Sequence, residues 1–211
     1  MRRLPDLRLM LVTDAAMTER RGLLATVRSA VDGGVTIVQL RDKDASDDDL
    51  VALARALRAD LAPRGVPLVV NDRPMVAKAA GADGLHIGQE DGDPRAVRRL
   101  LGPDAILGLS VTRAAEVATV DPAVVDYVGL GPVFSTATKA DAAPPLGLGG
   151  FRTVGAMLPV PFVAIGGIDA GSAAPIIAAG ASGIAVVSAI CAASDPRSAA
   201  AALRAAMEPA P

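Results

Sequence analysis

Short runs of apolar residues recur at regular intervals along this chain. Each run is nearly continuous in apolar character rather than alternating with polar residues, which is typical of parallel strands that are buried on both faces. Between the runs lie stretches with the periodicity and the capping residues of amphipathic helices. We therefore expect eight strands, at residues 9–12, 36–40, 67–70, 84–87, 105–109, 124–130, 160–165 and 183–187.

The stretches between these runs predict helices. Asp, Ser and Pro at their starts indicate caps and first-turn residues, and glycines follow where a helix should end. Eight strand–helix units in 211 residues indicate an α/β protein, a single (β/α)8 TIM barrel that spans residues 1–211. The main alternative is an open doubly wound sheet, but no Gly-x-Gly-x-x-Gly motif follows the first strand. The helical candidates are residues 47–61, 94–101, 114–119, 171–179 and 196–207.

Composition excludes several classes of protein. The formal net charge is −2, with 51 % apolar and 21 % charged residues. This balance excludes a disordered chain and gives no electrostatic basis for binding nucleic acid or an anionic membrane. No apolar run approaches the roughly 18 residues of a membrane span, and no signal peptide is evident at the start. Because Cys191 is the only cysteine, we expect no internal disulfide and a reducing, cytoplasmic location.

Chemistry is expected at the carboxyl ends of the strands. In a closed parallel barrel these ends all open on one face, where active sites are built. Residues that follow the apolar runs should therefore meet in space, although they are far apart in the sequence. They are Gln39, Arg41, Lys43, Asn71, Asp72, Gln89, Glu90, Asp91, Ser110, Thr136, Thr138, Lys139, Gly166, Gly167 and Ser188.

Asp72 and Asp91 follow neighbouring strands and predict a metal site. Mg²⁺ is usually held by one or two carboxylates, while phosphate oxygens and water complete its octahedron. Taken singly, Asp72 could be a helix cap ahead of Arg73 and Pro74, and Asp91 could be part of a turn. As a pair beside cationic side chains, they favour Mg²⁺.

Three cations are expected around the same opening: Arg41, Lys43 and Lys139. Lysine is rare in this chain, which otherwise uses arginine, so the lysines at these positions indicate a specific role. With Asn71 and Ser110 as neutral donors, the set suits a pyrophosphate held together with Mg²⁺. The alternative interpretation is solvated surface charge.

A second phosphate site is indicated further along the chain. The pair Gly166-Gly167 would let main-chain amides approach an anion, and the dipole of the following helix would add to the attraction. Val187 and Ser188 offer donors at the next strand end. The only histidine, His86, lies inside an apolar run and is interpreted as a packed histidine. With one His and one Cys, a zinc site of the usual type is excluded.

Seven segments together resemble the thiamine-phosphate synthase family. They occur in the family's order and cover nearly the whole chain. The segments are VQLRDK at 38–43, VNDR at 70–73, GLHIGQED at 84–91, GLS at 108–110, DYVGLGPVFSTATK at 126–139, AIGGI at 164–168 and AVVS at 185–188.

The resemblance implies a transferase that joins a hydroxymethylpyrimidine diphosphate to a thiazole phosphate, with thiamine phosphate and pyrophosphate as products. It implies a dissociative course, in which pyrophosphate leaves before the thiazole nitrogen captures the pyrimidine cation. Arg41, Lys43, Lys139 and Ser110 would be catalytic, and Asp72 and Asp91 would bind Mg²⁺. The pyrimidine diphosphate would contact Gln39, Arg41, Lys43, Asn71, Ser110 and Lys139, and the thiazole phosphate would contact Thr136, Ala137, Thr138, Gly167, Val187 and Ser188.

Two other functions remain open at this level. The related thiazole tautomerases share the barrel without the full metal pair, and they often have His where this chain has Thr112. A barrel that only binds thiamine phosphates is the third hypothesis. Departures from the family are small: Met10 stands where an aromatic residue is common, and Asp42 stands where Glu is common. Oligomeric state is left open, a homo-oligomer included.

Overall fold

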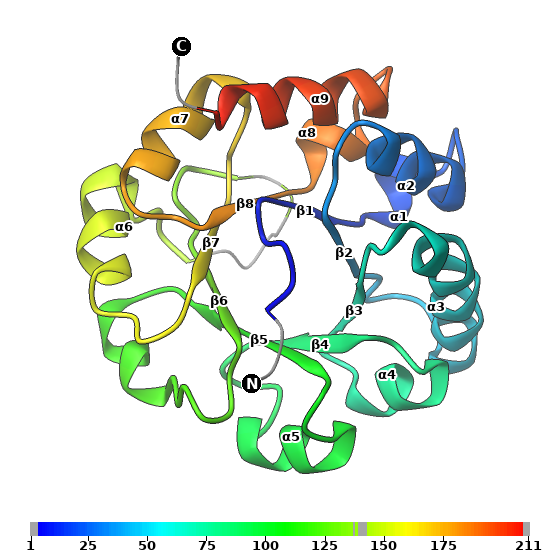
Figure 1. Cartoon of the computed structure of the whole chain (residues 1–211), viewed down its shortest axis with the longest axis horizontal. Helices are drawn as coiled ribbons and strands as arrows, with labels where there is room; N and C mark the ends of the chain where they lie inside the picture. Colours follow the sequence, from blue (N-terminus) through cyan, green and yellow to red (C-terminus); the bar gives the residue numbers. More distant parts are fainter. Residues whose placement is uncertain (1–3, 137, 139–142, 209–211) are drawn as a thin grey trace.

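Eight parallel strands close into a barrel, viewed along its axis in Figure 1. The computed structural model describes residues 4–136, 138 and 143–208. Each strand pairs with its neighbours in sequence order, and β8 pairs with β1, with Leu9 opposite Ile184. This closure confirms the TIM barrel and excludes the open sheet. The strands are β1 (Leu9–Val12), β2 (Ile37–Leu40), β3 (Leu68–Asn71), β4 (Gly84–Ile87), β5 (Ile106–Val111), β6 (Tyr127–Leu130), β7 (Phe162–Ile165) and β8 (Gly183–Val186).

Helices surround this ring of strands (Figure 1). Ser46 caps α3 (Asp47–Leu61) and Asp93 caps α5 (Pro94–Leu101), each accepting a bond from a first-turn amide, as the capping signals predict. The segment Ala114–Thr119 was expected to be an α-helix, but it forms the 3-10 helix η2. The α-helices are α1 (Ala15–Thr18), α2 (Leu23–Asp32), α3 (Asp47–Leu61), α4 (Pro74–Ala80), α5 (Pro94–Leu101), α6 (Gly147–Gly155), α7 (Ala170–Ala178), α8 (Ser188–Cys191) and α9 (Pro196–Ala206), and the 3-10 helix η1 (Ala62–Arg64) follows α3.

Several strands begin or end at different residues from the apolar runs that predicted them. β6 begins only at Tyr127, because a turn precedes it in which the Asp121 carbonyl accepts a bond of 2.9 Å from the Val124 amide. β3 and β5 continue beyond their apolar runs, so Asn71 and Ser110 are strand residues. Main-chain pairing extends these strands regardless of side-chain polarity, since the ladder uses only backbone groups.

Two apolar cores result from the alternation of side chains along the strands. In β4, Leu85 and Ile87 belong to the large core between the strands and the helices. The outward-facing residues of the other strands belong to the same core. The opposite faces of the strands fill the barrel interior. Its buried apolar members are Leu7, Met10, Val12, Ile37, Val69, Tyr127, Val163 and Ala185. Polar side chains that point inward must therefore be accommodated inside this smaller core.

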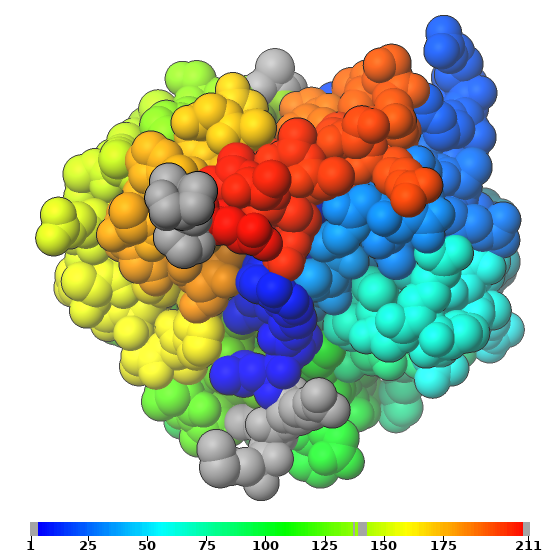
Figure 2. All heavy atoms as spheres, turned by 45° about the horizontal axis from the view of Figure 1, so that its top comes forward, coloured from blue at the N-terminus to red at the C-terminus, as the bar shows by residue number. Residues whose placement is uncertain are grey.

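The segment ahead of β1 lies across one opening of the barrel (Figure 1). Its Leu7 is buried with the interior core, and Figure 2 shows the segment, in dark blue, at the surface next to α9 in red. This segment does not cover the opposite opening, at the carboxyl ends of the strands, where a functional site can therefore form. No helix in the described part of the chain has the length and apolar character needed to cross a membrane.

Candidate active site

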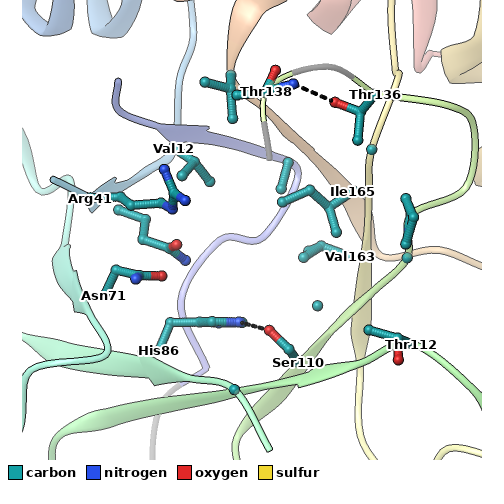
Figure 3. A pocket seen from close by; sticks show the side chains of 18 of the residues that line it. Val12, Arg41, Asn71, His86, Ser110, Thr112, Thr136, Thr138, Val163 and Ile165 are labelled. Atoms are coloured by element: carbon teal, nitrogen blue, oxygen red, sulfur yellow. Dashed lines mark hydrogen bonds between the residues drawn. The ribbon is translucent and has the colours of Figure 1, made fainter. Parts of the chain in front are cut away.

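A cavity of about 520 Å³ opens at the carboxyl ends of the strands. Figure 3 shows Arg41, Asn71 and His86 on one side of it and Thr136 and Thr138 on the other. The structure thus brings together both groups of predicted site residues. Those that line the cavity are Gln39, Arg41, Lys43, Asn71, Asp72, Asp91, Ser110, Thr136, Thr138, Gly167, Val187 and Ser188. Two further predicted residues, Ala137 and Lys139, lie outside the described residues.

Three of these residues lie within strands rather than after them. Gln39 is in β2, Asn71 ends β3, and Ser110 is in β5. Gln39 is only 4 % exposed, so its amide belongs to the floor of the cavity. The expectation that Gln39, Asn71 and Ser110 follow their strands was wrong, because inward-facing residues at the carboxyl end of a strand already reach the opening.

The two predicted metal ligands, Asp72 and Asp91, lie close together. Burial raises the pKa of Asp72 to about 6, the adjacent Asp91 carboxyl adds to this rise, and Lys43 opposes it. Asp91 is held in place by the Gly88 amide, which donates a bond of 2.7 Å to its Oδ2. A cation beside this pair of carboxyls would be stabilising, because it would offset the cost of an ionised Asp72.

Asp72 has an unusual backbone. Its φ of 64° is in the left-handed region, which non-glycine residues other than Asn and Asp seldom adopt. The Arg73 amide donates to the Asn71 carbonyl at 2.8 Å, which closes a tight γ-turn around Asp72. The Asp72 amide donates to the His86 carbonyl at 2.8 Å. The turn thereby directs the Asp72 carboxyl into the cavity beside β4.

Arg73 connects this turn to the neighbouring loop between β2 and α3. Its guanidinium donates to the carbonyls of Ala45 (2.6 Å) and Lys43 (2.9 Å) and to the carboxylate of Asp47 (2.9 Å). Lys43 lines the cavity, so one side chain fixes the relative position of a predicted metal ligand and a predicted cation. No local pattern predicts this role for Arg73, because its carbonyl partners are close to it only in the folded structure.

The Gly166-Gly167 turn packs tightly against the segment that follows β6. Both glycines have positive φ, at 100° and 65°. A Cβ on Gly166 would come within 2.5 Å of Pro132, and one on Gly167 within 2.5 Å of the Ser135 carbonyl oxygen. The helix that follows is α7, whose start is capped by Asp169: the carboxylate accepts a bond from the Ser172 amide at 2.9 Å. The attraction of an anion by the dipole of this helix stays a prediction.

His86 is buried, as the sequence predicted, but it also lines the cavity, which the packed-histidine interpretation missed. Its Nδ1 lies 2.9 Å from the Tyr127 hydroxyl and its Nε2 lies 2.9 Å from Ser110 Oγ. Burial lowers the pKa of His86 to about 4 and raises that of Tyr127, so both side chains are neutral at pH 7. Side chains alternate between the two faces of a strand. Because Leu85 and Ile87 face the surrounding helices, the alternation could have predicted that His86 points into the barrel.

A second group that the sequence did not predict lies at the rim of the cavity. Glu116 accepts bonds from the Thr112 amide (2.7 Å) and hydroxyl (3.0 Å) and pairs with Arg113 at 2.8 Å. All three residues line the cavity. The Glu116 side chain therefore stabilises the turn after β5, and this turn forms part of the cavity wall.

Comparison with known proteins places the chain in one family. A family model described as thiamine monophosphate synthase matches residues 9–190. The chain is 56 % identical over 202 residues to a thiamine-phosphate synthase of Xanthobacter autotrophicus, and 51 % identical over 203 residues to one of Azorhizobium caulinodans; each alignment covers 96 % of both chains. A solved thiamine phosphate pyrophosphorylase from Pyrococcus furiosus superposes with a TM-score of 0.86 at 32 % identity, covering 96 % of each chain. The chain therefore belongs to the thiamine monophosphate synthase family.

Proposed function

We propose that this chain acts as a thiamine-phosphate synthase, a transferase that forms thiamine phosphate from a pyrimidine diphosphate and a thiazole phosphate. Membership of the family and the synthases among its relatives support this activity. One observation supports the assignment of substrates to residues. The residues predicted for the pyrimidine diphosphate and those predicted for the thiazole phosphate line the same cavity. A thiazole tautomerase is not favoured, because the relatives named above are thiamine-phosphate synthases. The chain also has both aspartates, Asp72 and Asp91, and it has Thr112 where the tautomerases often have His.

The diphosphate end of the reaction is assigned to the side of the cavity formed by β2 to β5. Arg41 and Lys43 would bind the diphosphate oxygens, with Asn71 and Ser110 as neutral donors. The bond between the pyrimidine methylene carbon and the diphosphate oxygen breaks, and its electron pair leaves with pyrophosphate. Cations already in position stabilise this charge as it develops, without reorganisation at the moment of reaction. Lys139 remains a prediction for the same role.

Asp72 and Asp91 fit a Mg²⁺ ion. The adjacent carboxyls provide the one or two acidic ligands that this ion usually takes from a protein. Within the described residues no group of three or more His, Cys, Asp or Glu side chains is placed to hold a metal, so diphosphate oxygens and water would complete the shell. When bound, Mg²⁺ supplies Lewis-acid neutralisation of the diphosphate charge.

The thiazole phosphate is assigned to the opposite side of the cavity. Thr136, Thr138, Gly167 and Ser188 would hold its phosphate through hydroxyl and main-chain donors, with Val187 beside them and Ala137 a further prediction. This arrangement would present the thiazole nitrogen to the pyrimidine carbon. The nitrogen donates its lone pair to form the new bond, and no proton transfer is needed for that step.

The proposed activity is tested by incubating the purified chain with both substrates and Mg²⁺. Thiamine phosphate and pyrophosphate should appear in equal amounts, and omission of either substrate or of Mg²⁺ should abolish both. Folded protein that binds the substrates without forming product would favour the third hypothesis, a binding barrel. Isomerisation of a thiazole phosphate without Mg²⁺ would favour the tautomerase.

Substitution of Arg73 should disturb the diphosphate end of the site alone. We expect Arg73→Ala to raise the KM for the pyrimidine diphosphate and the Mg²⁺ requirement about 10-fold, because Lys43 and Asp72 lose their common support. The KM for the thiazole phosphate should stay the same. Steady-state kinetics with each substrate varied in turn measure the difference.

Arg55→Ala is the matched control. Arg55 also donates to a main-chain carbonyl, that of Ala79, at 2.9 Å, and it connects α3 to α4 away from the cavity. Its loss should leave both KM values within about 2-fold of the original. Equal effects of the two substitutions would mean that Arg73 contributes only to general stability.

A further inference from the structure

We propose that Thr13 is a positioning residue for Arg41, the arginine assigned to the diphosphate. The inference deepens the proposed function and rests on it for the identity of the ligand. Thr13 directly follows β1 and is only 1 % exposed. It is not among the residues that line the cavity, so it would act through Arg41 rather than by touching the substrate.

The Thr13 hydroxyl contacts both main-chain polar groups of Arg41. It accepts a bond of 2.9 Å from the Arg41 amide and donates to the Arg41 carbonyl at 3.3 Å. A hydroxyl can do both at once, because it has one proton to donate and lone pairs that accept. The Thr13 amide donates to the Gln39 carbonyl at 2.9 Å, so the threonine is itself fixed against β2. One buried side chain thus holds the backbone of Arg41 at the end of β1.

Arg41 needs this support because it lies just beyond Leu40, the last residue of β2. Side chains alternate along an extended chain. Gln39 lines the cavity, Leu40 belongs to the outer core, and Arg41 lines the cavity again (Figure 3). Arg41 keeps this alternation only while its backbone continues the direction of β2. The Thr13 hydroxyl gives its amide an acceptor, where a strand residue would be bonded by the main chain of its neighbour.

The guanidinium of Arg41 depends on its backbone for its direction. Among the described residues it takes part in no side-chain hydrogen bond or ion pair, in contrast to Arg73 and Arg98. A cation that is in place before the ligand binds loses less conformational freedom on binding, and it stabilises developing charge without reorganisation. Thr13 would thereby strengthen the binding of a diphosphate at Arg41.

Thr36 makes the same pair of contacts at the opposite end of the same two strands. Its hydroxyl accepts from the Leu9 amide at 3.0 Å and donates to the Leu9 carbonyl at 3.1 Å. Leu9 begins β1 and Thr36 precedes β2, so this pair lies at the amino ends of the strands, away from the cavity. Residues at this end of a barrel contribute to stability rather than to the active site. Thr36 is therefore a matched control, with the same bonds but without Arg41.

Calorimetric titration with inorganic pyrophosphate and Mg²⁺ tests the inference without turnover. We expect Thr13→Val to raise the dissociation constant about 10-fold, because valine keeps the shape but can neither accept from the Arg41 amide nor donate to its carbonyl. Thr13→Ser keeps the hydroxyl, so its dissociation constant and that of Thr36→Val should stay within about 2-fold of the original. Should Thr13→Val not fold, Thr13→Ala removes the same two bonds without adding a methyl group.

A double-substitution cycle tests whether the effect passes through Arg41. In an Arg41→Ala background, Thr13→Val should change the dissociation constant of pyrophosphate by less than about 2-fold, because the group that it positions is gone. The thermal midpoints of Thr13→Val and Thr36→Val should fall to a similar extent, because each substitution breaks the same two bonds. Stability would then be affected alike, and only Thr13→Val would weaken pyrophosphate binding.

The outcomes separate this inference from the proposed function. Unchanged affinity in Thr13→Val, equal losses in Thr13→Val and Thr36→Val, or equal losses with and without the Arg41 side chain would each overturn the inference and leave the proposed function intact. A loss that Thr13→Ser does not restore would also overturn it. If the unaltered chain does not bind pyrophosphate with Mg²⁺, the diphosphate assignment is wrong and the inference is overturned with it.

Discussion

Asp72→Asn is expected to lower kcat at saturating substrates by roughly 100-fold or more and to shift the Mg²⁺ requirement to higher concentrations. Asparagine has the same shape and tolerates the φ of 64° that the turn requires, so the backbone should be retained. What disappears is one of two negative charges that would hold the cation. The rate measured as a function of Mg²⁺ concentration separates weaker metal binding from a slower chemical step.

The same substitution should not destabilise the metal-free protein. Burial and the Asp91 carboxyl disfavour the ionised form of Asp72 in the folded state, as its raised pKa indicates. A neutral amide avoids that cost, so the thermal midpoint without Mg²⁺ should stay the same or rise. A loss of activity together with retained stability would identify Asp72 as a residue kept for function rather than for folding.

Asp93→Asn is the matched control for this prediction. Asp93 is two residues from Asp91 and caps α5, accepting bonds from the amides of Arg95 and Ala96. Asparagine is an equally good cap, so both activity and stability should change little. Unaltered Mg²⁺-dependent turnover in Asp72→Asn would show that the metal assignment is wrong.

Arg98→Ala should destabilise the fold by about 3–5 kcal/mol, the usual cost of breaking a buried ion pair from one side. Arg98 and Asp126 have side chains only 12 % and 9 % exposed and lie 2.6 Å apart. Arg98 also donates to the Val124 carbonyl at 2.7 Å, and Asp126 accepts from the Leu107 amide at 2.8 Å. Its removal would leave the Asp126 carboxylate buried without its cation.

Arg95→Ala provides the comparison on the same helix. Arg95 pairs with Asp121, but its side chain is 67 % exposed, and such surface pairs contribute less than about 1 kcal/mol. Urea unfolding of both variants at neutral pH measures the two free energies under the same conditions. A loss of about 1 kcal/mol or less for Arg98→Ala would mean that the pair is not needed to anchor α5 to the barrel. Neither arginine lines the cavity, so the activity of the folded fraction should be retained.

The amino-acid sequence by itself determined the architecture and most of the residues that line the cavity. Eight apolar runs correspond to the eight strands, because parallel strands buried on both faces must be apolar on both. Barrel closure then brings their carboxyl ends to one opening, which is why residues as distant as Gln39 and Ser188 could be assigned to one cavity. The resemblance added roles to these positions.

Only the tertiary structure decided which side chains act on one another. Asp72 and Asp91 are adjacent because β3 and β4 are neighbours and a left-handed turn redirects Asp72. The contacts of Arg73 and those of His86 with Tyr127 and Ser110 involve carbonyls and ring nitrogens whose positions no local pattern specifies. Local propensity acts over a few residues, whereas these contacts join different strands and loops, so they exist only once the barrel has closed.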